Sequence, residues 1–385
     1  MSGGRTRQLR FLLAGGGSGG HIYPALDIGA ELLKRYPYAR LLYVGGKRGL
    51  EGNLIPREGH DFAAITVAGF ERKLSLGTLV TAAKAGIGFI QSMAIVARFR
   101  PDVAVGTGGY ASGPAILAAS FAGVPVLIHE QNVVPGATNR LLARRAQVVA
   151  ISWEESKQYL PDPGRAVLTG NPIRSGVTKA SRQDGCGEFG FDPSRPIVLA
   201  TGGSQGALNI NTAVIGSMPA LVQRGAQFLL ATGLDKFDSA TQLAQEAGLR
   251  LSVDSHGIAR SSGGDVIIMP YIYNMPLAQA CADLMVARSG AITLAEIAAR
   301  GIPSVLIPHP KVPDNVQERN ARALEARGAA VVVLDRDLNA ELLTSVVGQL
   351  LDDRHRRAAM SVEVSKVGIP DAASRVVKCV ESLIG

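Results

Sequence analysis

The sequence predicts an α/β protein made of two doubly wound domains in tandem, and three observations support this fold class. The chain has 385 residues, which is long for one domain. Short runs of Val, Ile and Leu alternate with glycine turns or helix-like stretches, as buried parallel strands joined by crossover helices do. The two halves also begin alike, with LLAGGGSGG at 12–20 and VLATGGSQG at 198–206.

The strand-like runs fall into two series, each typical of a Rossmann-like domain. We expect strands at 9–14, 41–44, 103–105, 125–128 and 148–151, and then at 197–200, 227–232, 266–269, 284–286, 304–307 and 330–334. Between the series the chain is polar, contains Gly and Pro and shows no strong period, which is linker composition. The predicted organisation is an N-terminal domain at 1–174, a linker at 175–195, a C-terminal domain at 196–367, and a final helix at 368–385 that can return to the N-terminal domain.

Composition and charge exclude several classes of protein. The 40 Lys and Arg residues exceed the 32 Asp and Glu residues by 8, which fits either a solvated surface or attraction to an anionic ligand or membrane. No zinc finger or basic tail supports nucleic-acid binding. Three distant cysteines indicate neither a disulfide framework nor a zinc site. The apolar run near the N-terminus is too short for a signal peptide, and glycines and prolines break the uncharged stretch 103–128, so we expect no membrane span there.

The first glycine turn, GGGSGGH at 15–21, satisfies G-x-G-x-x-G after a strand and before a helix-like stretch. Backbone N–H groups and a helix N-terminus suit a diphosphate there, although the motif alone is a weak signal. No acidic residue ends the second strand to bind ribose, which disfavours NAD, while Lys47 and Arg48 leave NADP open. His21 closes the turn, where an imidazole can bind a hydroxyl or phosphate or take a proton, or else cap the helix.

Other polar segments also follow strands. Two further glycine turns follow strands at 106–110 and 202–206. Three such turns in one chain are what two diphosphate ligands would use. The segment RSGAITLAE at 288–296 predicts a helix start for a donor diphosphate, and Glu296 either accepts from ribose hydroxyls or is an ordinary solvated helix residue. Gln317 opens the next helix and can read sugar hydroxyls. The DRD motif at 335–337 is better interpreted as a helix start than as a metal site.

The stretch 70–100 combines apolar residues with cations. Some of its apolar residues must pack helices on the sheet. The others, with Arg72, Lys73, Lys84, Arg98 and Arg100 around them, predict a patch that rests on an anionic bilayer.

Taken together, the motifs resemble a known family. They occur in the family's order: GGSGGH at 16–21, GTGGYASGP at 106–114, HEQN at 129–132, GNPIR at 170–174, GGSQGA at 202–207, RSGAITLAEIAA at 288–299 and QERNA at 317–321. The family is that of the bacterial enzymes that add N-acetylglucosamine to undecaprenyl-pyrophosphoryl-N-acetylmuramoyl pentapeptide, the lipid precursor of peptidoglycan. The resemblance runs from about Arg10 to about Lys378. It implies the GT-B fold, with two Rossmann-like parallel-sheet domains facing across a cleft.

The resemblance also implies the reaction. UDP-N-acetylglucosamine is the expected donor, the acceptor's 4-hydroxyl attacks with inversion, and a β-1,4 link forms without a cofactor or a metal held by the protein. His21 is the candidate base or acceptor-orienting residue, and Arg174 stabilises the departing UDP. Backbone groups at Ile272 would meet uracil, Glu296 ribose, and Gln317 the sugar. The full set of expected donor contacts is Ser18, Gly19, Gly20, Asn132, Arg174, Ser204, Ile272, Ala291, Ile292, Thr293, Leu294, Ala295, Glu296 and Gln317, and the expected contacts of the acceptor pyrophosphate are Gly16, Gly17, Gly108, Gly109 and Tyr110.

Partners and location follow from the same resemblance. We expect a peripheral enzyme on the cytoplasmic face of the bacterial plasma membrane, docked through the patch near 72–100, that serves cell shape and division within a cell-wall synthesis complex. Three rivals stay open: a GT-B transferase for another lipid such as diacylglycerol, which HEQN and QERNA disfavour, an NADP-dependent oxidoreductase, and a membrane-binding scaffold without activity. The chain departs from the family at Ser18, where Thr is usual, at 273–275, where acidic residues are common, at Val316, where a polar residue is frequent, and at two apparent insertions, 181–193 and 254–264.

Overall fold

The computed structural model describes residues 8–47, 49–67, 76–174 and 176–384, with side chains of its long third helix from residue 83 onward. The chain divides into two compact units. Unit 1 comprises Met1–Arg174 and Ile369–Gly385, and unit 2 comprises Ser175–Gly368. The chain therefore leaves unit 1 once and comes back to it with its last helix.

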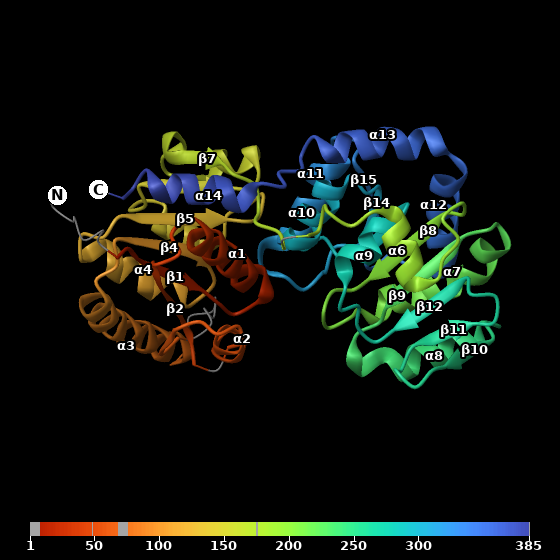
Figure 1. Ribbon diagram of the computed structural model, residues 1–385, viewed down its shortest axis with the longest axis horizontal. Coiled ribbons are helices and arrows are strands. Elements are labelled where there is room, and N and C mark those ends of the chain that lie inside the picture. The colour runs from red at the N-terminus through yellow and green to blue at the C-terminus, as the bar shows by residue number, and fades with distance from the viewer. Residues whose placement is uncertain (1–7, 48, 68–75, 175, 385) are drawn as a thin grey trace, which may run out of the picture. The chain divides into compact units, whose positions relative to one another are not determined.

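Unit 1 contains a seven-stranded parallel sheet in the order β3-β2-β1-β4-β5-β6-β7 (Figure 1). The first six strands of this order form the doubly wound arrangement, and the direction of winding reverses between β1 and β4. Ligands of such sheets bind where the carboxyl ends of these two strands diverge. The strands are β1 (Arg10–Gly15), β2 (Arg40–Gly46), β3 (Phe62–Ile65), β4 (Val103–Gly108), β5 (Val126–Glu130), β6 (Val148–Ile151) and β7 (Ala166–Leu168).

Helices cover both faces of the first sheet, because successive side chains of a strand point to opposite faces. In β1, Phe11 and Leu13 pack with helices α1 and α14, whereas Leu12 and Ala14 pack with α3 and α4. Helix α14 lies along α1 (Figure 1), and Arg35 pairs with Glu381 at 2.8 Å. The helices are α1 (Gly19–Arg35), α2 (Glu51–Arg57), α3 (Leu76–Phe99), α4 (Ser112–Phe121), α5 (Ala137–Leu142) and α14 (Ala372–Glu381), with 3-10 turns η1 (Glu154–Tyr159) and η2 (Pro163–Arg165).

Unit 2 repeats the same arrangement. Its sheet has the order β10-β11-β12-β9-β8-β13-β14-β15. The last six strands in this order, from β12 through β8 to β15, reproduce the doubly wound order, and the winding reverses between β8 and β13. Two antiparallel strands, β10 and β11, extend its edge. The strands are β8 (Ile197–Thr201), β9 (Gln227–Ala231), β10 (Leu251–Val253), β11 (Ala259–Ser261), β12 (Val266–Met269), β13 (Leu284–Ala287), β14 (Ser304–Leu306) and β15 (Ala330–Val332).

The helices of unit 2 begin inside the expected linker. Helix α6 starts with a capping box in which Ser181 and Asp184 bond each other's backbone, and it ends at Gly190 with a positive φ of 77°. Its buried Cys186 and Phe189 pack it into the unit, so residues 182–189 belong to unit 2 and the linker at 175–195 is revised. The helices are α6 (Arg182–Phe189), α7 (Leu208–Gln223), α8 (Phe237–Glu246), α9 (Met275–Cys281), α10 (Ala291–Arg300), α11 (Val316–Glu325), α12 (Ala340–Asp352) and α13 (Arg354–Ser365), with 3-10 turns η3 (Leu234–Lys236) and η4 (Pro313–Asn315).

Candidate active site

The first glycine turn follows β1 at the point where the winding of unit 1 reverses, and a buried carboxylate holds it. Glu51, only 2% exposed, accepts from the N–H of Gly17 at 3.0 Å and from that of Gly46 at 2.9 Å. The N–H of Gly16 donates to the carbonyl of Gly108 at 3.4 Å. A Cβ on Gly16 would lie 2.4 Å from the Glu51 carboxylate, so glycine is required by this close approach.

The N–H groups of Gly16 and Gly17 both bond inside the protein, so the contact of these two glycines with the acceptor pyrophosphate stays a prediction. The donors that remain lie at the start of α1. Ser18 is its N-cap, extended at φ −150° and ψ 159°, and its side chain makes no capping hydrogen bond. The N–H groups of Gly19 and Gly20 open this 17-residue helix at the positive end of its dipole, where an anion can bind.

The imidazole of His21 lies against the second glycine turn. Its Nδ1 is 3.0 Å from the carbonyl oxygen of Thr107 and 3.2 Å from Oε1 of Gln131. Gly108, at φ 100°, leaves room for the ring, since a Cβ there would lie 2.9 Å from Nδ1. A Cβ on Gly109 would lie 2.0 Å from the carbonyl oxygen of Gly16. Gly108 and Gly109 are expected pyrophosphate ligands. Because they have no side chains, the imidazole and the first glycine turn can pack against this second turn.

Two further expected ligands, Asn132 and Tyr110, differ in how firmly the protein holds them. Glu130 is buried and accepts from the backbone N–H of Asn132 at 2.9 Å, from its side-chain Nδ2 at 3.1 Å, and from Nδ2 of Asn139 at 2.8 Å. This carboxylate fixes the expected donor ligand Asn132 at the end of β5. Tyr110, in contrast, is exposed at the tip of the turn.

Arg174, the last residue of this part of unit 1, returns to the same edge of the sheet. Its guanidinium lies 4.7 Å from the centroid of the Tyr23 ring on α1, a cation–π contact. Among the residues that the structure describes, no ion pair involving Arg174 is observed. The cation is therefore held over α1 within unit 1, close to the start of that helix.

In unit 2 the third glycine turn follows β8. The N–H of Gly203 donates to Oγ1 of Thr201 at 3.1 Å, and the ammonium of Lys236 donates to the carbonyl of Gln205 at 2.7 Å. A Cβ on Gly206, at φ 67°, would lie 1.8 Å from the carbonyl of Thr232. The turn is thus pressed against the loop after β9, and Ser204 is exposed at its tip.

The neighbouring strand β13 leads into α10, whose start offers free N–H groups as that of α1 does. Gly290 is the N-cap and has no side chain to occupy the first N–H groups of this 10-residue helix. Glu296 is only 8% exposed and accepts from Nε2 of Gln279 at 2.8 Å, so the alternative of an ordinary solvated helix residue is wrong. The hydroxyl of Ser289 donates to the carbonyl of Gln317 at 2.8 Å, which ties the start of α11 to that of α10.

The other expected donor contacts of unit 2 include Gln317 and Ile272. The side-chain Oε1 of Gln317 accepts from the N–H of His309 at 2.9 Å, which leaves the amide Nε2 as its donor toward a ligand. Ile272 follows β12 with a buried side chain, so its backbone is the part that can meet a ligand. Tyr273 is exposed and packs edge-on against Tyr271, with ring centroids 5.0 Å apart.

The DRD motif is not a helix start. Arg288 pairs with Asp335 at 2.5 Å between two side chains that are both about nine-tenths buried. Asp335 also accepts from Nδ2 of Asn209 at 2.7 Å, and α12 begins only at Ala340, capped by Asn339. The expected interpretation of 335–337 as the helix start is therefore wrong, since its first carboxylate neutralises the arginine that precedes α10.

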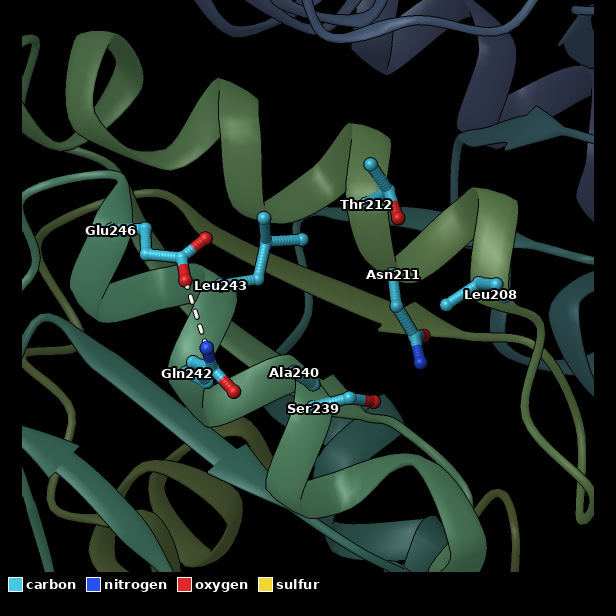
Figure 2. A pocket seen from close by; sticks show the side chains of 8 residues that line it. All are labelled: Leu208, Asn211, Thr212, Ser239, Ala240, Gln242, Leu243 and Glu246. Carbon is cyan, nitrogen blue, oxygen red and sulfur yellow. Dashed lines mark hydrogen bonds between the residues drawn. The ribbon is translucent and has the colours of Figure 1, made fainter.

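A separate hollow of about 200 Å³ lies between α7 and α8 (Figure 2). None of the expected donor residues lines it. One of its side chains, Asn211, donates from Nδ2 to the carbonyl of Thr232 at 3.0 Å and so supports the loop against which the third glycine turn packs. The lining residues are Leu208, Asn211, Thr212, Ser239, Ala240, Gln242, Leu243 and Glu246.

The predicted membrane patch is partly core and partly surface. On α3, Val96 is buried and Phe89 packs edge-on against Phe121, whereas Ile87 and Ile90 are 49% and 70% exposed. Of the expected cations, those at 84, 98 and 100 are exposed, and those at 72 and 73 lie outside the described residues. Within the described part of the chain, no helix is long and apolar enough to cross a membrane.

Sequence reasoning missed several residues that shape these sites. Glu51 and Gln131 were given no role, although both are buried polar residues at the edge of the sheet where the glycine turns lie. A polar run such as HEQN directly after a buried strand is a usable signal for Gln131. Glu51 offers no comparable signal, because the groups that it binds are backbone N–H groups.

Comparisons with known proteins match both units. The model of the glycosyltransferase family 28 N-terminal domain matches residues 11–151, and that of the family 28 C-terminal domain matches residues 197–376. A curated protein of Thermoanaerobacter sp. (strain X514) is 42% identical over 375 residues, which are 97% of this chain and 100% of that protein. One of Moorella thermoacetica is 41% identical over 373 residues, 97% of this chain and 98% of that protein. Both are named UDP-N-acetylglucosamine–N-acetylmuramyl-(pentapeptide) pyrophosphoryl-undecaprenol N-acetylglucosamine transferase.

Solved structures show the same architecture over the whole chain. MurG of Acinetobacter baumannii superimposes with a TM-score of 0.75 at 27% identity, covering 97% of this chain and 99% of that one. The UDP-GlcNAc 2-epimerase of Neisseria meningitidis, solved bound to UDP-GlcNAc, gives a TM-score of 0.66 at 14% identity over 97% of this chain and 100% of that one. The second likeness concerns the fold alone. Together with the two doubly wound sheets, the first identifies the fold as GT-B.

Proposed function

Since this chain belongs to glycosyltransferase family 28, we propose that it transfers N-acetylglucosamine from UDP-N-acetylglucosamine to N-acetylmuramyl-(pentapeptide) pyrophosphoryl-undecaprenol. The observation that carries the proposal is the pair of helix starts at the two reversal points, α1 in unit 1 and α10 in unit 2. Each offers unpaired N–H groups to an anion. The donor and the lipid acceptor each contain a diphosphate, so two such sites match the two substrates.

Unit 2 binds the donor in this proposal. The N–H groups at 291–293 would take the diphosphate, with Ser204 beside them, and the segment continues through Leu294 and Ala295 to Glu296. The carboxylate of Glu296 suits two ribose hydroxyls, because its oxygens accept hydrogen bonds, as they do from Gln279. Backbone groups at Ile272 would meet the uracil edge, and Nε2 of Gln317 would donate to the sugar.

Unit 1 supplies the acceptor's side. Its anion site is the start of α1 at Ser18, Gly19 and Gly20, and Asn132 and Tyr110 lie at neighbouring strand ends. A helix N-terminus favours a phosphate. Arg174, held over Tyr23 of α1, is kept for the departing UDP. Five of the residues that the resemblance assigns to the donor therefore lie in unit 1 with the residues that it assigns to the acceptor pyrophosphate, whereas the rest of the donor set lies in unit 2.

The chemistry is an inverting displacement at the anomeric carbon. The acceptor's 4-hydroxyl oxygen forms the new bond to this carbon while the bond to the UDP oxygen breaks, and the hydroxyl proton passes to Nε2 of His21, the candidate base. The leaving UDP carries the bonding electron pair away as negative charge. Helix N–H groups and the guanidinium of Arg174 would stabilise this charge as it develops.

The exposed face of α3 docks the enzyme on the membrane that holds its acceptor. Ile87 and Ile90 would enter the interface, and the exposed cations at 84, 98 and 100 would meet anionic headgroups. In this proposal the enzyme is peripheral on the cytoplasmic face. Its part in a cell-wall synthesis complex stays a prediction.

Ligand binding and UDP release test the proposal. UDP should raise the Tm of the purified protein and NADPH should not, since mass action stabilises only a form that binds. UDP release from UDP-N-acetylglucosamine should require the muramyl-pentapeptide lipid and should not occur with diacylglycerol. Stabilisation by NADPH alone, or equal release with both lipids, would contradict the proposed function.

A further inference from the structure

A buried chain of hydrogen bonds ends at His21 and begins at a carbonyl 149 residues away in sequence, that of Gly170. Nε2 of His129 lies 2.9 Å from this carbonyl oxygen. Because a carbonyl oxygen only accepts, Nε2 of His129 must carry the proton. Its Nδ1 is then an acceptor, and Nε2 of Gln131 donates to it at 3.0 Å.

The amide of Gln131 is oriented by the same bonds. Its Nε2 also donates to the carbonyl of Thr107 at 2.7 Å and lies 3.2 Å from that of His129, so the amide nitrogen faces three acceptors and Oε1 must point the other way. This Oε1 lies 3.2 Å from Nδ1 of His21, and the Thr107 carbonyl lies 3.0 Å from the same atom. With two acceptors in front of it, Nδ1 of His21 carries the proton.

We propose that His129 and Gln131 are positioning residues that hold His21 in its Nδ1–H tautomer, so that Nε2 presents a lone pair to the acceptor hydroxyl. This inference rests on the proposed function, in which His21 is the base. In water, neutral histidine favours the opposite tautomer. In that tautomer Nε2 already carries the proton and cannot accept another from the hydroxyl. This hydrogen-bond relay, from the Gly170 carbonyl through His129 and Gln131 to His21, therefore leaves Nε2 of His21 ready to accept a proton before the substrate arrives.

The surroundings of the relay support it. His129, Gln131 and Thr107 are all buried, where water does not compete for their hydrogen bonds. Burial also lowers the pKa of His129 to about 4. The ring is thus neutral at working pH, as a hydrogen bond accepted at its Nδ1 requires.

Nitrogen NMR of the full chain, labelled with ¹⁵N-histidine, tests the tautomers directly. At pH 7.5, His21 should show a protonated Nδ1 and an unprotonated Nε2, and His129 should show the reverse. Signals are assigned from the variants His21→Gln and His129→Gln. A protonated Nε2 on His21 would overturn the inference, even if the enzyme transfers N-acetylglucosamine. Correct tautomers without any transfer would instead overturn the proposed function, so the two failures are distinguishable.

Kinetics test whether the relay matters for turnover. Gln131→Met keeps the shape of the side chain but removes both of its hydrogen-bonding ends, and we expect kcat to fall about tenfold or more with KM for UDP-N-acetylglucosamine nearly unchanged. The control is Gln147→Met, which removes a glutamine acceptor from the N–H of Val126 in the same unit and should leave kcat unchanged. Equal kcat in the wild type and Gln131→Met, or a loss that appears only in KM, would contradict a positioning role.

Discussion

The carboxylate of Glu51 accepts the N–H of Gly17 at 3.0 Å, so a buried acid occupies a position in the first glycine turn that the sequence motif assigns to a phosphate. The N–H of Gly46 bonds the other oxygen of the same carboxylate. Glu51 therefore holds the turn in shape from the protein side. The N–H groups left for a ligand are those at the start of α1.

Replacing Glu51 should loosen this turn. Glu51→Ala leaves the buried N–H of Gly46 without an acceptor, which costs about 1 to 3 kcal/mol, and it releases the N–H of the exposed Gly17. We expect a lower free energy of unfolding in urea and a higher KM for the lipid acceptor, with KM for the donor little changed. Glu58→Ala, an exposed change just after α2, is the control. A Glu51 variant as stable as this control would refute the bracing role.

Glu296 should control donor affinity. Glu296→Gln keeps the size of the side chain but replaces a charged acceptor by an amide, and we expect UDP to bind about tenfold more weakly, since hydrogen bonds to charged groups are worth about 1.5 to 3 kcal/mol. Isothermal titration with UDP measures this. Glu246→Gln, on the exposed end of α8, should bind as the wild type does. An unchanged Kd for Glu296→Gln would remove this residue from the donor site.

The exposed face of α3 should govern membrane binding. Ile90→Glu places a charge where 70% of the side chain is exposed, so stability should change by no more than about 0.5 kcal/mol. Binding to vesicles that contain anionic lipid should fall, and in the wild type it should also weaken with salt. Leu234→Glu, a similarly exposed apolar position in unit 2 at 65%, is the control. If both variants sediment equally with vesicles, the docking surface lies elsewhere.

His129 should make folding pH-dependent. Burial lowers its pKa from 6.5 to about 4, so above pH 6.5 the ring is neutral in both the folded and the unfolded chain. As pH falls from about 6.5 through about 4, the unfolded chain gains a proton that the folded chain does not take. Stability is therefore lost in this window, by about 3 kcal/mol in total.

Urea unfolding between pH 4 and 7 checks this dependence. His129→Gln should be less stable than the wild type at pH 7, and its stability should fall less steeply toward pH 4. The exposed His256 supplies the comparison, since His256→Gln should keep the wild-type slope. An unaltered slope in His129→Gln would mean that this ring does not carry the effect.

Much of the fold follows from local pattern. The predicted strands at 9–14 and 197–200 match β1 and β8 to within one residue, because a fully buried parallel strand is a continuous apolar run. The structure adds β3, β7, β10 and β11, which have 3 or 4 residues each and are partly exposed. In strands this short, even an apolar sequence such as the FAAI of β3 is too brief to stand out as a strand. The capping box at Ser181 was readable, but the polar composition around it favoured a linker.

The candidate site was less predictable, because its geometry depends on distant partners. G-x-G-x-x-G indicates that N–H groups are available but not which of them point outward, and Glu51 decides this for Gly17. The tautomer of His21 depends on Gln131, 110 residues away, and through it on the carbonyl of Gly170. The motifs thus identify which residues matter, whereas the hydrogen bonds show what each of them does.

The mass of the lipid product tests the proposed transfer directly. The purified protein is incubated with UDP-N-acetylglucosamine and N-acetylmuramyl-(pentapeptide) pyrophosphoryl-undecaprenol in anionic vesicles, and the lipid is analysed by mass spectrometry. We expect a lipid heavier by one N-acetylglucosamine residue, formed in step with UDP and strongly reduced in His21→Ala. UDP released without this product, or an unmodified lipid while the protein binds UDP and vesicles, would contradict the proposed transfer.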